Sequence, residues 1–126
     1  MRANESMGAF LGDQSFPVQA IYHAQLAVEE IGTNIIKYGY DDRQEHPITL
    51  RVECGPDAVR LRFLDDGRPF DVRQVPEPDP GLSLDERKAG GWGISLVRRL
   101  SRSMDYERRD GRNVLTLELP RDGGSL

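Results

Sequence analysis

The chain has 126 residues, of which 37% are hydrophobic and 30% are charged, and its formal net charge is −4. This composition predicts one soluble globular domain over residues 1–126 and excludes a disordered chain or a membrane-spanning protein. The negative charge argues against nucleic acid as a direct partner, because phosphate backbones are bound by basic surfaces.

Residues 1–16 form a lead-in that is weakly helical over residues 4–12. Ser15 or Asp13 is available to cap the helix that follows. The first residues lack the apolar core of a signal peptide, so we expect a cytoplasmic protein without a membrane segment.

A long amphipathic helix is predicted over residues 17–38. Pro17 suits its first turn, and Gly39 is predicted to end it. Apolar residues recur at steps of three and four and predict one buried stripe, which comprises Ile21, Ala24, Val28, Ile31, Ile35 and Tyr38.

Two β-hairpins are predicted, the first from residues 47–54 and 58–64 and the second from residues 104–109 and 113–119. Residues 110–113 are read as the turn of the second hairpin. Apolar and polar residues alternate along these strands, so one face of each is buried. The inward-facing residues are predicted to be Ile48, Leu50, Val52, Cys54, Val59, Leu61, Phe63, Leu115, Leu117 and Leu119.

Between the hairpins lie a proline- and glycine-rich connection over residues 71–90 and a short helix over residues 93–103. A connection of this length is typical of a functional lid. Residues 121–126 are predicted to be a loose tail. Three arginines of the short helix region are predicted to face water, or to dock an acidic partner, namely Arg98, Arg99 and Arg102.

The element order is therefore helix, strand, strand, lid, helix, strand, strand. Because hairpins dominate, the sheet is predicted to be mainly antiparallel (mixed), with the helices on one face. The sequence predicts an α+β two-layer sandwich.

A first polar group lies on the flank of the main helix. Glu30 and Asn34 are four residues apart, and Lys37 follows three residues later. A carboxamide oxygen is a suitable Mg²⁺ ligand when phosphates and waters complete the coordination. A glutamate one turn earlier would orient or deprotonate an attacking hydroxyl in phosphoryl transfer. Alternatively, these are solvated residues of a helix flank.

A second group, DDGRPF at residues 65–70, follows a predicted inner strand. Asp65 can accept a hydrogen bond from an exocyclic amine such as that of adenine. Gly67 permits a flat ring to approach the backbone closely. Alternatively, this segment is an ordinary turn after a strand.

A third group, GGWG at residues 90–93, opens the short helix. The free N–H groups of a helix start favour phosphate. The segment is not a dinucleotide fingerprint, because Leu96 stands at the third glycine position, and no Walker A loop is present. Alternatively, it is a flexible hinge.

Together the three groups resemble the GHKL (Bergerat) ATP-binding fold, and within it the anti-sigma-factor serine kinases of the partner-switching type. Residues 30–34 are similar to the family's N box, residues 65–70 to its first glycine box, and residues 91–96 to its second. Their order and spacing agree with the family, and the resemblance covers residues 18–120.

The resemblance implies ATP and Mg²⁺ as cofactors. Asn34 resembles the residue that binds Mg²⁺ at the ATP phosphates, and Glu30 resembles the general base that activates a substrate serine. Lys37 resembles a phosphate-contacting position.

The other ATP contacts implied by the resemblance come from the two glycine boxes and comprise Asp65, Gly67, Phe70, Gly91, Trp92 and Gly93. Asp65 resembles the adenine-reading aspartate, and Gly91 and Gly93 resemble the phosphate-facing glycines. The 71–90 connection resembles the ATP lid. Trp92, which follows it, would pack against this lid or, alternatively, contact the nucleotide.

Members of this family phosphorylate a serine on a small STAS-type antagonist protein, sequester a sigma factor, and usually act as homodimers. The resemblance implies the same partners here. A rival interpretation is a regulatory module that binds ATP and a partner without transferring phosphate. The ATPase domain of a histidine kinase is disfavoured, because no phosphoacceptor helix is recognisable.

Two features depart from the family pattern. Family members usually begin with an extra strand, which is predicted to be missing because only residues 1–16 precede the main helix. Some kinase members carry an arginine just before the second glycine box. Here that place holds Ala89, with Arg87 and Lys88 slightly earlier, so phosphate contact by either of these two is a further hypothesis.

Overall fold

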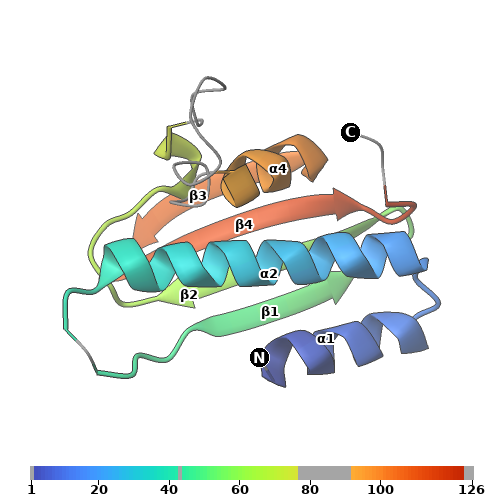
Figure 1. Ribbon diagram of the computed structural model, residues 1–126, viewed down its shortest axis with the longest axis horizontal. Coiled ribbons are helices and arrows are strands. Elements are labelled where there is room, and N and C mark those ends of the chain that lie inside the picture. The colour runs from blue at the N-terminus through green and yellow to red at the C-terminus, as the bar shows by residue number, and fades with distance from the viewer. Residues whose placement is uncertain (1, 43, 77–91, 124–126) are drawn as a thin grey trace.

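The computed structural model describes residues 2–42, 44–76 and 92–123. They form, in chain order, α1 (Arg2–Asp13), α2 (Val18–Gly39), β1 (Thr49–Cys54), β2 (Ala58–Asp65), the 3₁₀ turn η1 (Val72–Gln74), α4 (Trp92–Leu100), β3 (Ser103–Arg109) and β4 (Arg112–Pro120). The helices form one layer and a four-stranded sheet forms the other, which confirms the predicted α+β sandwich (Figure 1). Within these ranges, every helix is too short or too polar to cross a membrane.

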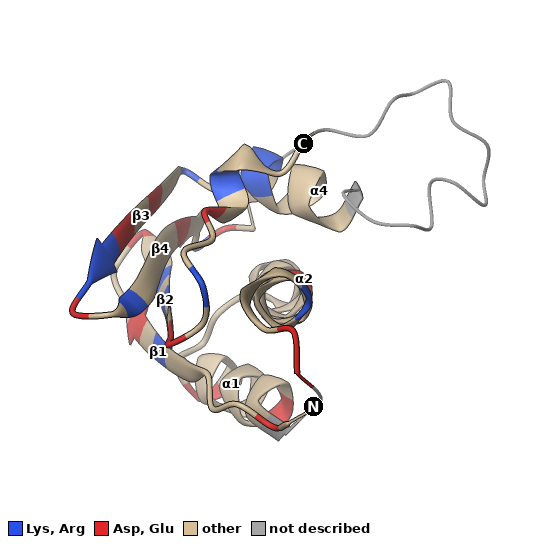
Figure 2. Cartoon of the chain, turned by 90° about the vertical axis from the view of Figure 1, so that its left-hand side faces the viewer, with Lys and Arg blue, Asp and Glu red and all other residues tan. Residues whose placement is uncertain are grey.

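The strand order is β1-β2-β4-β3, and all three neighbouring pairs are antiparallel. The predicted alternation is confirmed on the two central strands, where the inward residues are buried: Val59, Leu61, Phe63, Leu115, Leu117 and Leu119. The described helices all cover this one face, so the opposite face of the sheet is open (Figure 2).

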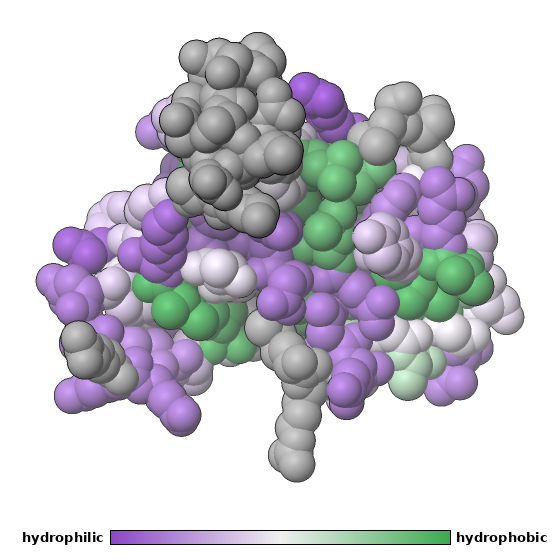
Figure 3. All heavy atoms as spheres, in the orientation of Figure 1, coloured by the Kyte–Doolittle hydropathy of each residue, from purple (hydrophilic) through white to green (hydrophobic). Residues whose placement is uncertain are grey.

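The core fills the space between the sheet and the helices. Buried apolar residues come from α1, α2 and α4 and include Leu11, Ala24, Val28, Ile31, Ile35, Ile94 and Val97. Burying each of the larger side chains contributes about 1.5–3 kcal/mol. Tyr38, which the sequence assigns to the buried stripe, is instead 43% exposed. On the helix side of the molecule, hydrophilic residues surround separate apolar areas (Figure 3).

Both ends of α2 differ from the prediction. No side chain caps its start, where Pro17 is the N-cap residue, so the predicted cap at Ser15 or Asp13 is wrong. Gly39 is the last helical residue, and the chain leaves through an extended Tyr40 rather than through a left-handed glycine.

The β3–β4 turn is shorter than predicted. Asp110 and Gly111 have φ angles of 52° and 76°, as a two-residue hairpin turn requires. Strand β4 therefore begins at Arg112, one residue before the predicted strand 113–119, and Asn113 within it is buried.

Two arginines also differ from expectation. Arg98 is half-buried and donates to the carbonyl oxygen of Val72 at 2.9 Å and to that of Val75, whereas it was predicted to face water. Arg121 donates to the Gln14 carbonyl oxygen at 2.8 Å and lies over the Phe16 ring, so the predicted loose tail is wrong at this residue.

Candidate nucleotide-binding site

Helix α2 positions Glu30 and Asn34 one turn apart, and both side chains are half-buried. The Asn34 Nδ2 atom donates to the Glu30 carbonyl oxygen at 2.8 Å. This bond turns the Asn34 Oδ1 atom away from the helix backbone. A neutral oxygen is therefore presented at the flank of α2.

The start of α4 lies directly against Glu30. A Cβ atom built on Gly93 would stand 2.0 Å from the Glu30 carboxyl carbon. Only glycine leaves room for the carboxylate in this position. The predicted N box and the described part of the second glycine box are therefore in contact.

The first glycine box meets the other end of α2. A Cβ atom on Gly67 would stand 2.8 Å from the Gly39 carbonyl oxygen, which also accepts from the Arg68 amide at 2.9 Å. Phe70 stacks on Tyr38 with ring centroids 5.0 Å apart. Because Tyr38 is four residues beyond Asn34, Phe70 is placed on the Asn34 flank of the helix.

Asp65 is buried at the end of β2 and is fixed through one oxygen. Its Oδ1 atom accepts from the Gly67 amide at 2.9 Å and from the Asn113 Nδ2 atom at 3.0 Å. Neither of these bonds uses the other carboxylate oxygen, Oδ2.

Asn113 also belongs to this site, although none of the three polar groups of the sequence contains it. Its Nδ2 atom also donates to the Arg68 carbonyl oxygen at 2.8 Å. Its Oδ1 atom accepts from the Tyr106 hydroxyl at 2.5 Å and from the Phe70 amide at 3.3 Å. The signal that could have revealed it is its place in the predicted strand 113–119, two residues before the inward-facing Leu115, because residues two apart on a strand face the same side of the sheet.

A polar cluster lies beside Gly67. The Tyr40 hydroxyl donates to Asp66 Oδ1 at 2.7 Å, and the Tyr40 ring stacks on His46, which pairs with Asp42 at 2.7 Å. Burial, and then the bond to Asp66, raise the pKa of Tyr40 to about 12. A hollow of 380 Å³ opens between this cluster and Gly67.

The remaining predicted site residues have few contacts that the structure describes. Lys37 is exposed, and its ammonium lies 5.1 Å from the centre of the Tyr38 ring. Trp92 begins α4, but its side chain lies outside the description. Gly91, Arg87, Lys88 and most of the predicted lid fall in residues 77–91, which are also outside the described residues.

The described side chains could coordinate a metal ion only if a bound nucleotide supplied further oxygen ligands. Among the described residues, no group of three or more His, Cys, Asp or Glu side chains could hold an ion. Asn34 would thus supply one oxygen, and phosphates and water would supply the rest, which is the coordination that Mg²⁺ accepts.

A model of the histidine kinase-like ATPase domain family matches residues 2–119. The chain belongs to this family. The contacts of α2 with both glycine boxes agree with that membership, and ATP is the nucleotide that an ATPase family implies.

Several curated proteins are similar to this member of the family. The serine/threonine-protein kinase BtrW of Bordetella bronchiseptica is 33% identical over 73% of this chain and 65% of its own length. The serine-protein kinase RsbW of Listeria monocytogenes is 25% identical over 75% of this chain and 63% of its own length. The anti-sigma F factor of Clostridium beijerinckii is 24% identical over 86% of this chain and 76% of its own length.

The chain thus spans less than two thirds of the length of the Bordetella and Listeria relatives. No solved structure matches it.

Proposed function

We propose that this ATPase-family chain is an ATP- and Mg²⁺-dependent serine protein kinase of a partner switch. The observation that carries the proposal is the contact between Glu30 and Gly93, one helical turn from Asn34. It brings an acid, a neutral oxygen ligand and a helix start together, as phosphoryl transfer requires. The names of the Bordetella and Listeria relatives, both protein kinases, support the same activity.

In this proposal the triphosphate lies between α2 and the start of α4. Asn34 Oδ1 would help to hold a Mg²⁺ ion, which would offset the negative charge of the phosphates, and Lys37 would reach the phosphates from the next turn. Gly91, Trp92 and Gly93 would present backbone N–H groups to the same phosphates.

Glu30 would accept the proton of the substrate serine hydroxyl. The serine oxygen then bonds to the γ-phosphorus while the bond to the β-phosphate oxygen breaks and ADP leaves. Because Gly93 has no side chain, the Glu30 carboxylate can sit against the helix start where the phosphates would be held.

The adenine would bind at the other end of α2. Asp65 Oδ2 would accept from the exocyclic amine, while Asn113 and the Gly67 amide hold Oδ1. Because Gly67 has no side chain, the adenine ring could approach its backbone closely. Phe70 would lie between the adenine and Asn34.

The partners follow from the similarity to kinases and to an anti-sigma factor. The phosphate acceptor would be a serine on a small STAS-type antagonist, and the competing partner would be a sigma factor. The working form would be a homodimer in the cytoplasm, where sigma factors act.

The test is incubation with labelled ATP, Mg²⁺ and a candidate STAS-type protein. Label on a serine of the acceptor supports the kinase, whereas ATP-dependent binding without label supports the rival regulatory module. Glu30→Gln, which keeps the size of the side chain, should retain nucleotide binding and lose about 100-fold or more in transfer.

Asn34→Ala should impair the binding of Mg²⁺-ATP, which precedes phosphoryl transfer. Without the oxygen ligand, the affinity for Mg²⁺-ATP should fall by about 10- to 100-fold, as the loss of about 1.5–3 kcal/mol predicts. Equal affinity in the wild type and the variant would contradict the metal role of Asn34.

Asp65→Asn tests the adenine end. In the variant, the amide oxygen would keep the bonds from Gly67 and Asn113, so the NH₂ group would face the exocyclic amine of adenine. An NH₂ group cannot accept from an amine, so selectivity for ATP over GTP should decrease. Competition binding with the two nucleotides measures this, and an unchanged preference would count against the role of Asp65.

A further inference from the structure

The first glycine box, residues 65–70, is held by hydrogen bonds from three directions. The end of α2 holds it through the Gly39 carbonyl oxygen, and the segment after α2 holds it through the Tyr40 hydroxyl. The third direction is the β3–β4 hairpin, from which Asn113 and Arg108 donate to backbone carbonyl oxygens of the box. Asn113 also contacts the proposed adenine-reading carboxylate directly, whereas Arg108 contacts only the backbone.

Arg108 donates from Nη1 to the Gly67 carbonyl oxygen at 2.7 Å, although the two residues are 41 positions apart in the chain. Arg108 is exposed as a whole, but this bond is partly buried. A hydrogen bond from a charged donor is shorter and stronger than one between neutral groups. In the described part of the chain, no carboxylate lies within ion-pair distance of Arg108, so the Gly67 carbonyl is the partner that fixes this side chain.

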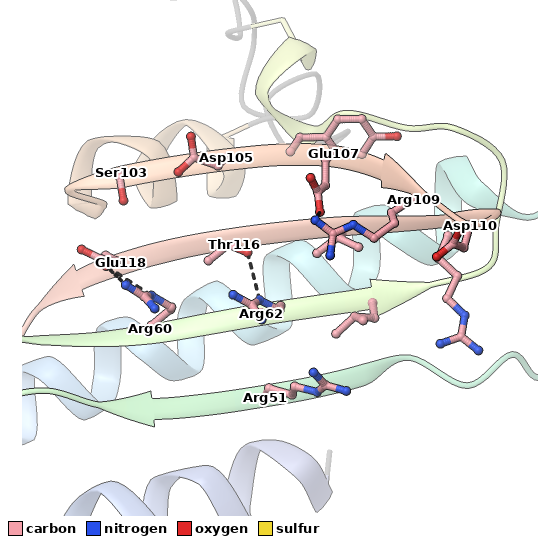
Figure 4. Close-up of a pocket in the computed structure, with 14 residues that line it drawn as sticks. Arg51, Arg60, Arg62, Ser103, Asp105, Glu107, Arg109, Asp110, Thr116 and Glu118 are labelled. Atoms are coloured by element: carbon pink, nitrogen blue, oxygen red, sulfur yellow. Dashed lines mark hydrogen bonds and ion pairs between the residues drawn. The ribbon is translucent and has the colours of Figure 1, made fainter.

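The strand places Arg108 on the side of the sheet that carries the proposed site. Its neighbours Glu107 and Arg109 lie on the open face, where they pair at 2.6 Å and line a hollow of 710 Å³ (Figure 4). Successive side chains of a strand point to opposite faces, so Arg108 points to the helix side. It stands directly opposite Asn113 in the register, and Asn113 is buried on that same side.

The bond from Arg108 acts on a single peptide unit, the one that joins Gly67 to Arg68. The carbonyl oxygen of this unit accepts from Arg108, and its N–H group donates to the Gly39 carbonyl oxygen at 2.9 Å. The C=O and N–H groups of a trans peptide point in opposite directions. The unit is therefore held at both ends, between β3 and the end of α2, and it cannot rotate without losing a bond.

The orientation of Gly67 in turn affects Asp65. The Gly67 amide donates to Asp65 Oδ1 at 2.9 Å. Glycine has the most permissive backbone of all residues, so the bonds on either side of it determine how its amide points. By holding the carbonyl side of Gly67, Arg108 steadies the amide that holds Asp65.

We propose that Arg108 is a positioning residue for adenine recognition. It acts on Asp65 through Gly67 and keeps the carboxylate in the orientation in which Oδ2 can accept from the exocyclic amine of adenine. Arg108 itself does not touch the nucleotide. The inference rests on the adenine role of Asp65 in the proposed function.

Loss of this donor should weaken ATP binding much more than GTP binding. Without Arg108 the peptide unit after Gly67 is free at one end, and Asp65 loses part of its support. The affinity for ATP should then fall about tenfold, the usual effect of losing a hydrogen bond from a charged group. Guanine presents an oxygen where adenine presents the amine, so GTP gains nothing from Asp65 and should bind nearly as before.

Competition binding of Mg²⁺-ATP and Mg²⁺-GTP to the whole chain tests the proposal. Arg108→Met keeps an unbranched apolar stem but has no donor, and it should lower the ratio of ATP affinity to GTP affinity about tenfold. Arg108→Lys keeps a charged donor and should recover most of the ratio. Arg109→Met is the matched control, because Arg109 is the next residue on the opposite face, and it should keep the wild-type ratio.

A double variant tests whether Arg108 acts through Asp65. When Asp65→Asn is already present, adding Arg108→Met should change the ratio by less than about twofold, because the two substitutions disturb the same contact. An equal decrease with and without Asp65→Asn would overturn the proposal. Loss of folding lowers the affinity for both nucleotides together, and thermal unfolding of each variant measures it separately.

The same measurements separate this inference from the proposed function. A wild type that binds ATP and GTP equally well would contradict the adenine role of Asp65 and would overturn both proposals. A wild type that prefers ATP, together with an Arg108→Met variant that keeps the full preference, would overturn the role of Arg108 alone.

Discussion

Single residues of the site differ in how they tolerate an added methyl group. At Gly93 the added Cβ would meet the end of the flexible Glu30 side chain, whereas at Gly67 it would meet the Gly39 backbone oxygen. A side chain can rotate away, but a helix backbone cannot. The two glycines should therefore respond differently to the same substitution.

Gly93→Ala should change the free energy of unfolding by less than about 1 kcal/mol but displace the Glu30 carboxylate and abolish most phosphoryl transfer. Gly67→Ala should lower the free energy of unfolding by about 1–3 kcal/mol, the usual range for overpacking. Urea unfolding and the transfer assay measure the two effects. Gly12→Ala is the control, because its Cβ would meet nothing within 4 Å, and it should be neutral or slightly stabilising.

Asn113 connects four partners beneath the proposed adenine site. Asn113→Ala removes all four hydrogen bonds and leaves buried polar groups unpaired, so the free energy of unfolding should fall by about 2–4 kcal/mol. Thr116→Ala, in the same strand but on the open face, should cost less than about 1 kcal/mol. An equal loss of unfolding free energy in both variants would show that the hydrogen bonds of Asn113 contribute no more than the single bond of Thr116.

The Tyr40–Asp66 pair predicts a pH effect. The pKa of Tyr40 in the folded state is about 12, above its ordinary value of 10.0, so its contribution to stability is complete below pH 10 and disappears as the pH rises towards 12. Asp66→Asn should lower this pKa without restoring 10.0, because burial is the first cause. Ultraviolet titration of tyrosinate, with Tyr40→Phe as the reference, measures it.

At the scale of elements, α4 is tied to the chain segment that enters the predicted lid. Arg98 holds the carbonyl oxygens of Val72 and Val75, and its Nε atom is buried with no partner among the described residues. The planar guanidinium therefore joins η1 to α4. This contact fixes the described start of the 71–90 connection relative to Gly93.

Arg98→Ala should lower the free energy of unfolding by about 1–3 kcal/mol and speed hydrogen exchange at the Val75 amide, which donates to the Val72 carbonyl oxygen. Arg99→Ala should change stability by less than about 0.5 kcal/mol, since Arg99 is exposed. If Val75 exchanges at the same rate in both variants, Arg98 does not anchor this segment.

At the scale of the whole molecule, the proposed nucleotide site lies on one side of the core. The helix layer and the strand ends carry the site, and the open face of the sheet lies on the opposite side of the buried apolar residues (Figure 2). Substitutions on the open face should therefore leave nucleotide binding intact unless they disturb the core.

Binding of Mg²⁺-ADP at 100 times its Kd should stabilise the fold by about 2.7 kcal/mol, which corresponds to a rise in melting temperature of about 10 °C for a chain of this size. The nucleotide with a chelator, and Mg²⁺ alone, are the controls and should have much smaller effects. No rise under any condition would contradict nucleotide binding itself.

The sequence by itself determined the element types, the strand alternation and the three polar groups, because these depend on periodicity and local spacing. It also indicated which helix carries Glu30 and Asn34. Only the tertiary structure decided that Glu30 touches Gly93, that Gly67 meets Gly39, and that Asn113 supports Asp65. Such contacts join residues far apart in the chain, and their geometry depends on how helices pack on a twisted sheet. Local patterns likewise placed Arg98 in water, since they contain no information about distant carbonyl groups that need a donor.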